Sequence, residues 1–294
     1  MNRLHQLITK FRLWFDTSAV PARLPSGVHH IDWVRVLPFV GMHLACLGVI
    51  WVGASWAAVA VAAALYVLRM FAITGFYHRY FSHRTYEVSR PVQFLIAVAG
   101  ATCVQRGPLW WAAHHRKHHR HADTEVDVHS PRYHGFWWSH MGWITSPENF
   151  PTDVRQVPDL ARYPELRFLD RFDIVVPLLL AVALFVAGGA QWLIWGFFIS
   201  TVVLFHCSCF INSLAHQLGR RRFPTPDDSK NSLLLSLITF GEGWHNNHHW
   251  YPGAARQGFY WWEVDFTFYG LWILSRLGII RNLHPVPARV LEHS

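Results

Sequence analysis

Hydrophobic residues gather in two long runs along the chain. From Leu37 to Tyr77 the only charged residue is Arg69, and a helix of this length would extend about 60 Å, enough to cross a hydrocarbon core of about 30 Å twice. Small residues and a tryptophan at Gly53–Trp56 can turn the chain outside the membrane. A second uncharged run, Ile174–Ala215, is interrupted at Gly188–Gln191. We therefore predict an all-α integral membrane protein with two transmembrane hairpins, the four spans being residues 37–54, 57–77, 174–190 and 192–212.

Three shorter apolar runs have a different interpretation. Residues 91–105, 231–240 and 266–275 are too short to cross a bilayer. We expect them to form interfacial or buried helices.

The distribution of Lys and Arg predicts the orientation. The chain has 26 of these residues, and neither predicted hairpin tip carries one. Because basic residues collect on the cytoplasmic side, we expect both termini and a helical cap, residues 78–172 and 213–294, to face the cytoplasm. The first thirty residues lack a sustained apolar core, so we expect no cleaved signal. The net charge of +8 follows largely from this topology, and we expect no nucleic-acid partner. The interpretation is one domain, residues 1–294, in a bacterial inner membrane.

Histidine supplies the candidate chemistry. The chain has 21 histidines, and nine of them lie near the cytoplasmic ends of the predicted spans. In His-x-x-His-His, the spacings i, i+3 and i+4 share one helical face, so we expect each such motif to direct three imidazoles to one point. The nine candidate ligands are His78, His83, His115, His118, His119, His216, His245, His248 and His249.

The number of histidines predicts the kind of metal centre. Two tetrahedral zinc ions use at most eight ligands, whereas nine imidazoles suit two five- or six-coordinate ions with positions left for water, oxygen or substrate. Imidazole binds iron as well as zinc, so we predict two iron ions. Glu242 precedes His245 by three residues and is interpreted as a supporting residue, not a ligand. The absence of His-Glu-x-x-His from the sequence argues against a zinc protease.

The other twelve histidines receive no ligand role. Four of them, His114, His121, His129 and His140, lie near the second motif and can at most support the ligands.

These motifs together resemble the membrane fatty acid desaturases of the acyl-CoA delta-9 (stearoyl-CoA) type. The similarity covers about residues 35–265, and its pieces are His-x-x-x-x-His at His78, His-x-x-His-His at His115, Asn212–His216, Ser139–Trp143 and the segment Gly-Glu-Gly-Trp-His-Asn-Asn-His-His that ends at His249. The resemblance implies four transmembrane helices beneath a cytosolic cap, and nine histidines that hold two irons, with Asn212 reaching a metal through water. It also implies insertion of a cis double bond into a long saturated acyl chain with O2 and two electrons.

The resemblance further implies a bent tunnel for the acyl chain. Gln105 and Trp111 match the residues at its kink, and Ser208 stands where the family has Thr. Alignment from His78 places Tyr66 and Met70 at the tunnel end, where they are i, i+4 neighbours that would limit chain length.

The acyl carrier and the electron donor are less well determined. The resemblance favours an acyl-CoA thioester, but Ala113–His114 stand where animal members have Arg-Asp, which leaves an acyl carrier protein thioester or a membrane lipid open. The sequence has no His-Pro-Gly-Gly haem motif. Its four cysteines contain no Cys-x-x-Cys pair, so we expect no disulfide framework, zinc knuckle or iron–sulfur cluster. Electrons are therefore expected from a separate ferredoxin, rubredoxin or cytochrome b5 type donor with its reductase.

Two other functions have to be weighed. A hydroxylase, ketolase or acetylenase could use the same metal centre, because product choice depends on tunnel geometry. A metal transporter would need polar residues along its spans, and few are present: Arg69, His43, His206 and His216.

Overall fold

The predicted all-α class is confirmed. The computed structural model describes residue 8, residues 11–18 and residues 30–292, so His5, His29 and His293 lie outside the described residues. Within the described part the chain forms helices, and its β-structure is limited to isolated bridges such as Glu87 with Arg281.

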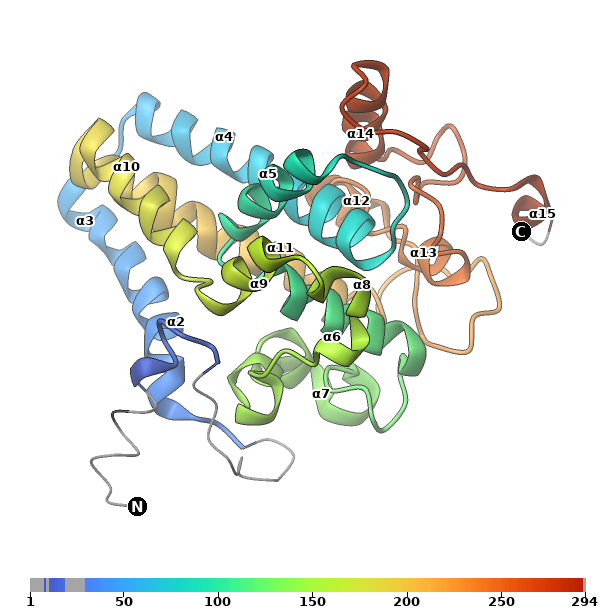
Figure 1. Cartoon of the computed structure of the whole chain (residues 1–294), viewed down its shortest axis with the longest axis horizontal. Helices are drawn as coiled ribbons and strands as arrows, with labels where there is room; N and C mark the ends of the chain where they lie inside the picture. The colour runs from blue at the N-terminus through green and yellow to red at the C-terminus, as the bar shows by residue number, and fades with distance from the viewer. Residues whose placement is uncertain (1–7, 9–10, 19–29, 293–294) are drawn as a thin grey trace.

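Among the residues that the structure describes, three helices are long and apolar enough to cross a membrane: Trp33–Val52, Trp56–Ser82 and Val175–Ser213. They form the left part of the molecule in Figure 1, and the remaining helices form the right part. Their segments are α2 (Trp33–Ala45), η1 (Cys46–Gly48), α3 (Val49–Val52), α4 (Trp56–Phe71), η2 (Ala72–Ser82), α10 (Val175–Trp192), η6 (Leu193–Ile199) and α11 (Ser200–Ser213).

The helix that contains the second predicted span is longer than the span itself. The second span was expected to end at Tyr77, but the helix continues through His78 to Ser82. The added turns have π-helical hydrogen bonding, and they are buried throughout. Packing in the interior therefore extends this helix beyond the end of the apolar run.

The chain turns sharply at both predicted breaks. Gly189, inside the 39-residue third helix, has φ 63°, and Gly53 has φ 64°, a conformation that glycine adopts without a steric penalty. The two turns touch: Ser55 Oγ donates to Gln191 Oε1 at 2.7 Å, and Gln191 Nε2 donates to the Val52 carbonyl at 2.9 Å. These bonds place the turn between α3 and α4 beside the turn in α10, at the left of Figure 1.

Arg69, the one charged residue of the first apolar run, lies inside the helix bundle and is 2% exposed. Its guanidinium donates to Thr201 Oγ1 at 2.6 Å, to Ser200 Oγ at 2.5 Å and to the Thr102 carbonyl at 3.2 Å. A buried charge is tolerated when it is hydrogen-bonded in this way. Arg69 therefore connects α4 to α11 and to Thr102, which follows the helix Arg90–Ala101.

The three short apolar runs are helical as expected: α5 (Arg90–Ala101), α12 (Leu233–Ile238) and α14 (Phe266–Arg276). Each keeps large apolar side chains at the surface, among them Leu95 at 63%, Leu234 at 70% and Trp272 at 51% exposed. The remaining helices are α6 (Pro108–His121), α7 (Pro131–His140), η3 (Gly142–Thr145), η4 (Pro147–Asn149), η5 (Val154–Gln156), α8 (Pro158–Ala161), α9 (Pro164–Arg171), α13 (His245–Trp250) and α15 (Ala288–Leu291).

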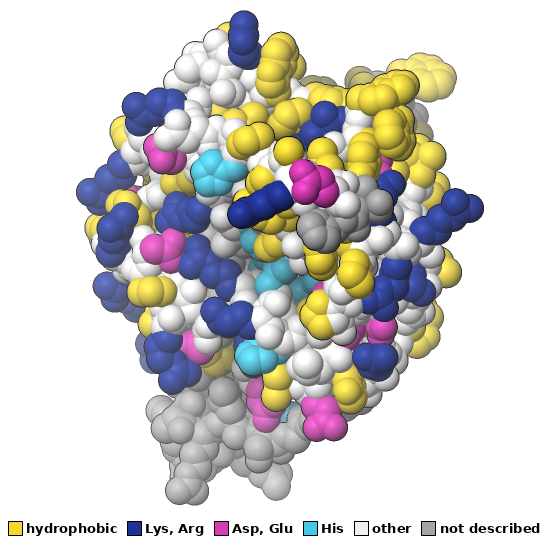
Figure 2. Space-filling view, turned by 90° about the vertical axis from the view of Figure 1, so that its right-hand side faces the viewer, with side chains coloured by type: hydrophobic (Ala, Val, Ile, Leu, Met, Phe, Trp, Pro, Cys, Tyr) yellow, Lys and Arg dark blue, Asp and Glu magenta, His cyan; other side chains and the backbone are white. Residues whose placement is uncertain are grey.

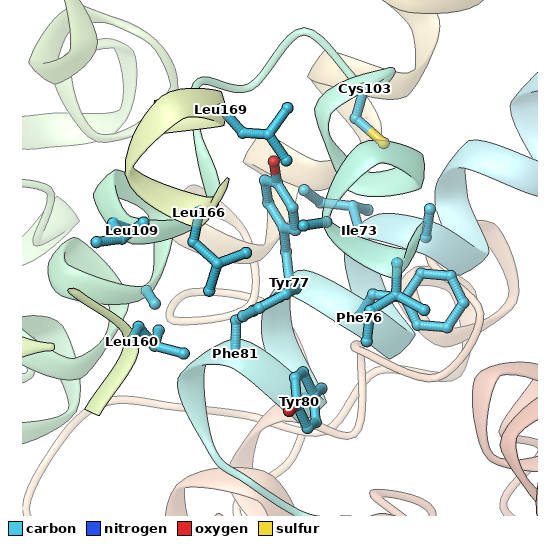
Figure 3. Close-up of a cluster of buried hydrophobic side chains, with 14 of the residues drawn as sticks. Ile73, Phe76, Tyr77, Tyr80, Phe81, Cys103, Leu109, Leu160, Leu166 and Leu169 are labelled. Atoms are coloured by element: carbon cyan, nitrogen blue, oxygen red, sulfur yellow. The ribbon is translucent and has the colours of Figure 1, made fainter. Parts of the chain in front are cut away.

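The main hydrophobic core holds η2 in place. Figure 3 shows Tyr77 and Phe81 of η2 pointing toward leucines from α6, α8 and α9. Gly100 of α5 lies so close to Tyr77 that a Cβ there would be 2.0 Å from the tyrosine ring. This packing fixes the segment that carries His78.

Candidate metal centre

The structure gathers the nine predicted histidines into two neighbouring clusters. Within each cluster, one nitrogen from every ring lies within 4.8 Å of the others. We call them the five-histidine cluster (His78, His83, His115, His119 and His248) and the four-histidine cluster (His118, His216, His245 and His249). Two groups of imidazoles at this spacing can each hold a metal ion.

The first motif depends on the π-helical turn of η2. In an α-helix, residues five apart point about 140° away from each other, so His78 and His83 would diverge. In η2 the His83 amide donates to the His78 carbonyl at 3.3 Å, the i to i+5 bond of a π-helix. The two rings consequently lie 4.9 Å apart and enter the same cluster.

The expectation that each His-x-x-His-His motif points to one site is wrong. On α6, His115 and His119 join the five-histidine cluster, while His118 joins the four-histidine cluster. On α13, His245 and His249 join the four-histidine cluster and His248 joins the other. Helix geometry explains the division, because i and i+4 are about 40° apart and i+3 and i+4 about 100° apart. Each helix therefore serves both clusters.

The nitrogen separations fit metal ligands. The Nε2 atoms of His78 and His248 are 3.0 Å apart, those of His248 and His119 are 2.9 Å apart, and those of His245 and His216 are 3.0 Å apart. Nitrogens bound to one ion at about 2.1 Å lie about 3.0 Å apart at a right angle and about 3.4 Å apart at the tetrahedral angle. The observed separations are short enough for the two nitrogens of each pair to bind the same ion.

Four of the histidines are held by carboxylates. Asp123 Oδ2 accepts from His216 Nδ1 at 2.7 Å, Asp127 Oδ2 from His118 Nδ1 at 2.9 Å, and Asp227 Oδ2 from His249 Nδ1 at 2.9 Å. Glu242 contacts His78 Nδ1. Such partners fix the ring orientation and leave the opposite nitrogen free for a metal. Glu242 was singled out from the sequence, but the three aspartates were not.

The aspartates carry only a weak sequence signal. Asp123 and Asp127 follow the second motif within eight residues of His119, and Asp227 lies in the loop before α12. Burial alone would raise their pKa values, but hydrogen bonds and the charges of the neighbouring histidines lower them well below the usual range. The carboxylates are therefore ionised acceptors.

Burial also keeps most of the cluster imidazoles neutral. The pKa values of His119, His245 and His248 lie well below 6.5 because burial disfavours the charged ring, and neighbouring histidines add repulsion. A neutral ring keeps the lone pair that a metal requires.

Figure 2 shows a face of the molecule on which histidine side chains reach the surface. Histidine side chains are visible inside a hollow near the middle of this face, with Lys and Arg side chains around it. His115, His119 and His249 are partly exposed, whereas His118, His245 and His248 are buried.

A cavity beside the clusters contains several of the predicted substrate residues. Met70, Trp111, Ser208 and Asn212 line it together with His78, His115, His118 and His245. Its volume is about 60 Å³, far below the ~300 Å³ of a small ligand pocket.

Two predicted tunnel residues lie next to this cavity. Gln105 Nε2 donates to Ser208 Oγ at 2.8 Å, and Trp111 Nε1 donates to Gln105 Oε1 at 3.4 Å. Tyr66 packs against Phe240 with ring centroids 6.3 Å apart, and its hydroxyl donates to the Ile238 carbonyl at 2.5 Å. The substrate roles of these residues remain predictions.

Some histidines without an assigned role form a hydrogen-bonded series between the membrane helices and the cap. His43 Nε2 lies 3.0 Å from His206 Nε2, and His206 Nδ1 lies 2.9 Å from His140 Nε2. His140 Nδ1 then contacts Ser213 Oγ at 3.0 Å. These contacts provide partners for polar rings within or next to the membrane helices.

The structure thus combines apolar helices long enough to cross a membrane with two histidine clusters that could each hold a metal ion. The family model "Fatty acid desaturase" matches residues 54–272. The chain belongs to the fatty acid desaturase family and is therefore an oxidoreductase, as the histidine motifs predicted.

Several similar proteins cover nearly the whole chain. The sn-2 palmitoyl-lipid 9-desaturase of Nostoc sp. (strain 36) is 36% identical over 90% of this chain and 94% of its own length. The sn-1 stearoyl-lipid 9-desaturase of Anabaena variabilis is 38% identical over 86% of this chain and 94% of its own length. The acyl-CoA 5-desaturase AL21 of Anemone leveillei is 34% identical over 94% of this chain and 88% of its own length.

Proposed function

We propose that this protein is an O2-dependent desaturase that places a cis double bond at the delta-9 position of a long saturated acyl chain. The conversion of –CH2–CH2– to –CH=CH– with reduction of O2 to two waters consumes two electrons and two protons. The observation that carries this proposal is the position of the two histidine clusters beside the cavity lined by Met70, Trp111 and Ser208.

The nine clustered histidines are the proposed ligands of two irons, and Asn212, which lines the cavity, is the residue proposed to reach one iron through water. Bound iron would supply the oxidising power that removes hydrogen from an unactivated methylene, which protein acids and bases lack. The carboxylates of Asp123, Asp127, Asp227 and Glu242 orient the imidazoles that they contact.

The cavity residues position the chain. Gln105 fixes the rotamer of Ser208 through their hydrogen bond, and the indole of Trp111 stacks on His115 with ring centroids 5.0 Å apart. A methylene beside Trp111 would therefore lie next to the five-histidine cluster. Met70, which is fully buried, closes the cavity on the side of the second membrane helix.

We propose a membrane lipid as the acyl carrier. The Nostoc and Anabaena relatives are named for lipid-linked palmitoyl and stearoyl chains and for position 9, and Ala113–His114 replace the Arg-Asp expected for an acyl-CoA enzyme. The acyl-CoA thioester remains the second candidate, because the Anemone relative is named for it.

The proposed topology has four crossings, with the histidine clusters and both termini on the cytoplasmic side. The contact between the turns at Ser55 and Gln191 supports a common side for the two hairpin tips. A cysteine introduced at Ala54 should react with an impermeant thiol reagent added outside intact cells, and one introduced at exposed Lys117 should react only after lysis. The reverse pattern would contradict this orientation.

The activity is tested in a desaturase-null bacterial host that expresses the chain with a reducing system. Gas chromatography with double-bond location should find a new delta-9 monoene that is absent with His248→Ala. Chains that carry only hydroxyl groups or triple bonds would instead support a hydroxylase or an acetylenase.

The acyl carrier is tested separately with the purified enzyme and one labelled substrate at a time. Desaturation of stearoyl chains in phospholipid vesicles and not of stearoyl-CoA supports the lipid carrier, and the opposite result supports the thioester.

A further inference from the structure

A second cavity, of about 550 Å³, lies outside the histidine clusters. Its walls come from the loop after α11 and from the segments that flank α12, and its distinctive feature is three successive arginines. The lining residues are Gly219, Arg220, Arg221, Arg222, Asn231, Ser232, Leu233 and Trp244.

In the part of the chain that the structure describes, one of the three arginines, Arg222, is paired with a carboxylate, whereas Arg220 and Arg221 are not. Arg222 forms an ion pair with Glu263 and also donates to Asn247 Oδ1 at 3.2 Å. Arg221 donates to the Thr225 carbonyl, which leaves its charge uncompensated. Among the residues that the structure describes, neither Arg220 nor Arg221 has a carboxylate partner, and both are exposed. The cavity is therefore suited to an anion, and the fork of guanidinium donors matches a phosphate group.

Exposed leucines surround this basic cavity. Leu218 is 56%, Leu233 54% and Leu234 70% exposed. The carbonyl of Ile238, at the end of α12, accepts the Tyr66 hydroxyl, and Tyr66 lies about 18 Å along the second membrane helix from His78. The helix α12 thus lies against the second membrane helix, with exposed leucines on its surface and with Arg220 and Arg221 beside its first turn.

The same two chain segments, residues 208–222 and residues 231–245, line both the basic cavity and the cavity beside the clusters. The first segment contributes Ser208 and Asn212 to one cavity and Gly219–Arg222 to the other. The second contributes Thr239 and His245 to one and Asn231–Leu233 to the other. The two cavities are therefore close along the chain, since Trp244 lines one and the next residue, His245, lines the other.

We propose that the cavity of Arg220 and Arg221 binds the phosphate headgroup of an anionic membrane glycerolipid whose acyl chain is the substrate. This inference rests on the proposed function for the fate of the lipid, while binding itself depends only on the arginines and the leucines beside them. It gives the enzyme access to chains that are already part of the bilayer.

The test measures lipid binding without turnover. The purified protein, in nanodiscs of phosphatidylcholine and without reductant, receives labelled phosphatidylglycerol, and bound label is compared for wild type, the double variant Arg220→Gln/Arg221→Gln and Arg276→Gln. Arg276 is the matched control because it is also exposed and lies beside the apolar Trp272, but it lines neither cavity. Circular dichroism at each step confirms that the variants are folded.

We expect the double variant to lose at least about tenfold in phosphatidylglycerol affinity and Arg276→Gln to retain it. Equal affinity in the wild type and the double variant would overturn the inference. Displacement of the label by millimolar inorganic phosphate would also overturn it, because the site would then be one for soluble anions. Since no reductant is present, the enzyme does not turn over, and a negative result here is distinct from a failure of desaturation.

Discussion

Asp123, Asp127 and Asp227 make the two clusters unequal at the scale of single residues. All three contact ligands of the four-histidine cluster, whereas the five-histidine cluster has Glu242 on His78. An imidazole that donates a hydrogen bond to an ionised carboxylate gives its other nitrogen more strongly to a metal ion. The four-histidine cluster should therefore hold its metal ion more tightly.

The substitution Asp227→Asn tests this support. It should lower the metal affinity of the four-histidine cluster by about 10- to 100-fold, because His249 loses its ionised partner. Asp228→Asn is the matched control, since the side chain of Asp228 forms a partly exposed pair with Arg132. Cobalt titration followed by absorption spectroscopy measures both. Equal affinities in the two variants would remove the role assigned to Asp227.

Single histidine substitutions should distinguish the two clusters. His248→Ala and His245→Ala each remove a ligand from a different cluster, so each should lower the iron content from about two ions per chain to about one and abolish desaturation. His121→Ala, an exposed residue of the same helix as His118, should change neither. Iron analysis of the purified variants provides the measurement, and full iron content in His248→Ala would refute its ligand role.

At the scale of elements, η2 is the segment on which the site depends most. Its π-helical turn brings His78 and His83 together, and its other face packs Tyr77 against α5. The position of the first histidine pair is therefore coupled to the packing of a helix that carries no ligand.

The substitution Gly100→Ala should reveal this coupling. A Cβ at Gly100 would lie 2.0 Å from the Tyr77 ring, and overpacking of this kind costs about 1–3 kcal/mol of unfolding free energy. The control is Gly41→Ala in α2, where a Cβ meets no atom within 4 Å and a gain of about 0.5–1 kcal/mol is expected. Thermal unfolding in detergent compares the two. An unchanged unfolding temperature for Gly100→Ala would show that η2 can shift without a loss of stability.

At the scale of the whole molecule, buried histidines link stability to pH. Burial lowers the pKa of His114, His140 and His249 to about 4 and that of His129 to about 3, against an ordinary value of about 6.5. Between pH 6.5 and 4 the unfolded chain therefore binds more protons than the folded chain at these sites. The raised pKa values of His118 and Asp170 act in the opposite sense, but the histidines with a lowered pKa are more numerous.

The metal-free protein should consequently lose stability as the pH falls from 7 to 4. Thermal unfolding at pH 7, 6 and 5 should give a steadily decreasing midpoint. His249→Gln should have a shallower dependence than the wild type, because one titrating group is removed. A midpoint that stays constant or rises toward pH 5 would contradict this account.

Local patterns in the sequence were sufficient to predict many features of the fold and of the site. The helical class, the breaks at Gly53 and Gly188–Gly189, the short helices and the family followed from runs, charges and motif spacings. The sequence also pointed to nine histidines that the fold gathers together. These features depend on residues near one another in the chain, which is why they could be read without coordinates.

Tertiary structure alone decided how those residues are shared. It divided each His-x-x-His-His motif between two clusters, extended the second membrane helix to Ser82, brought Asp227 to His249 across 22 residues and placed Arg220 beside α12. Spacing fixes the angle between neighbouring side chains on a helix but not the partner that each side chain faces. That partner depends on contacts between distant segments, which form only when the chain is packed.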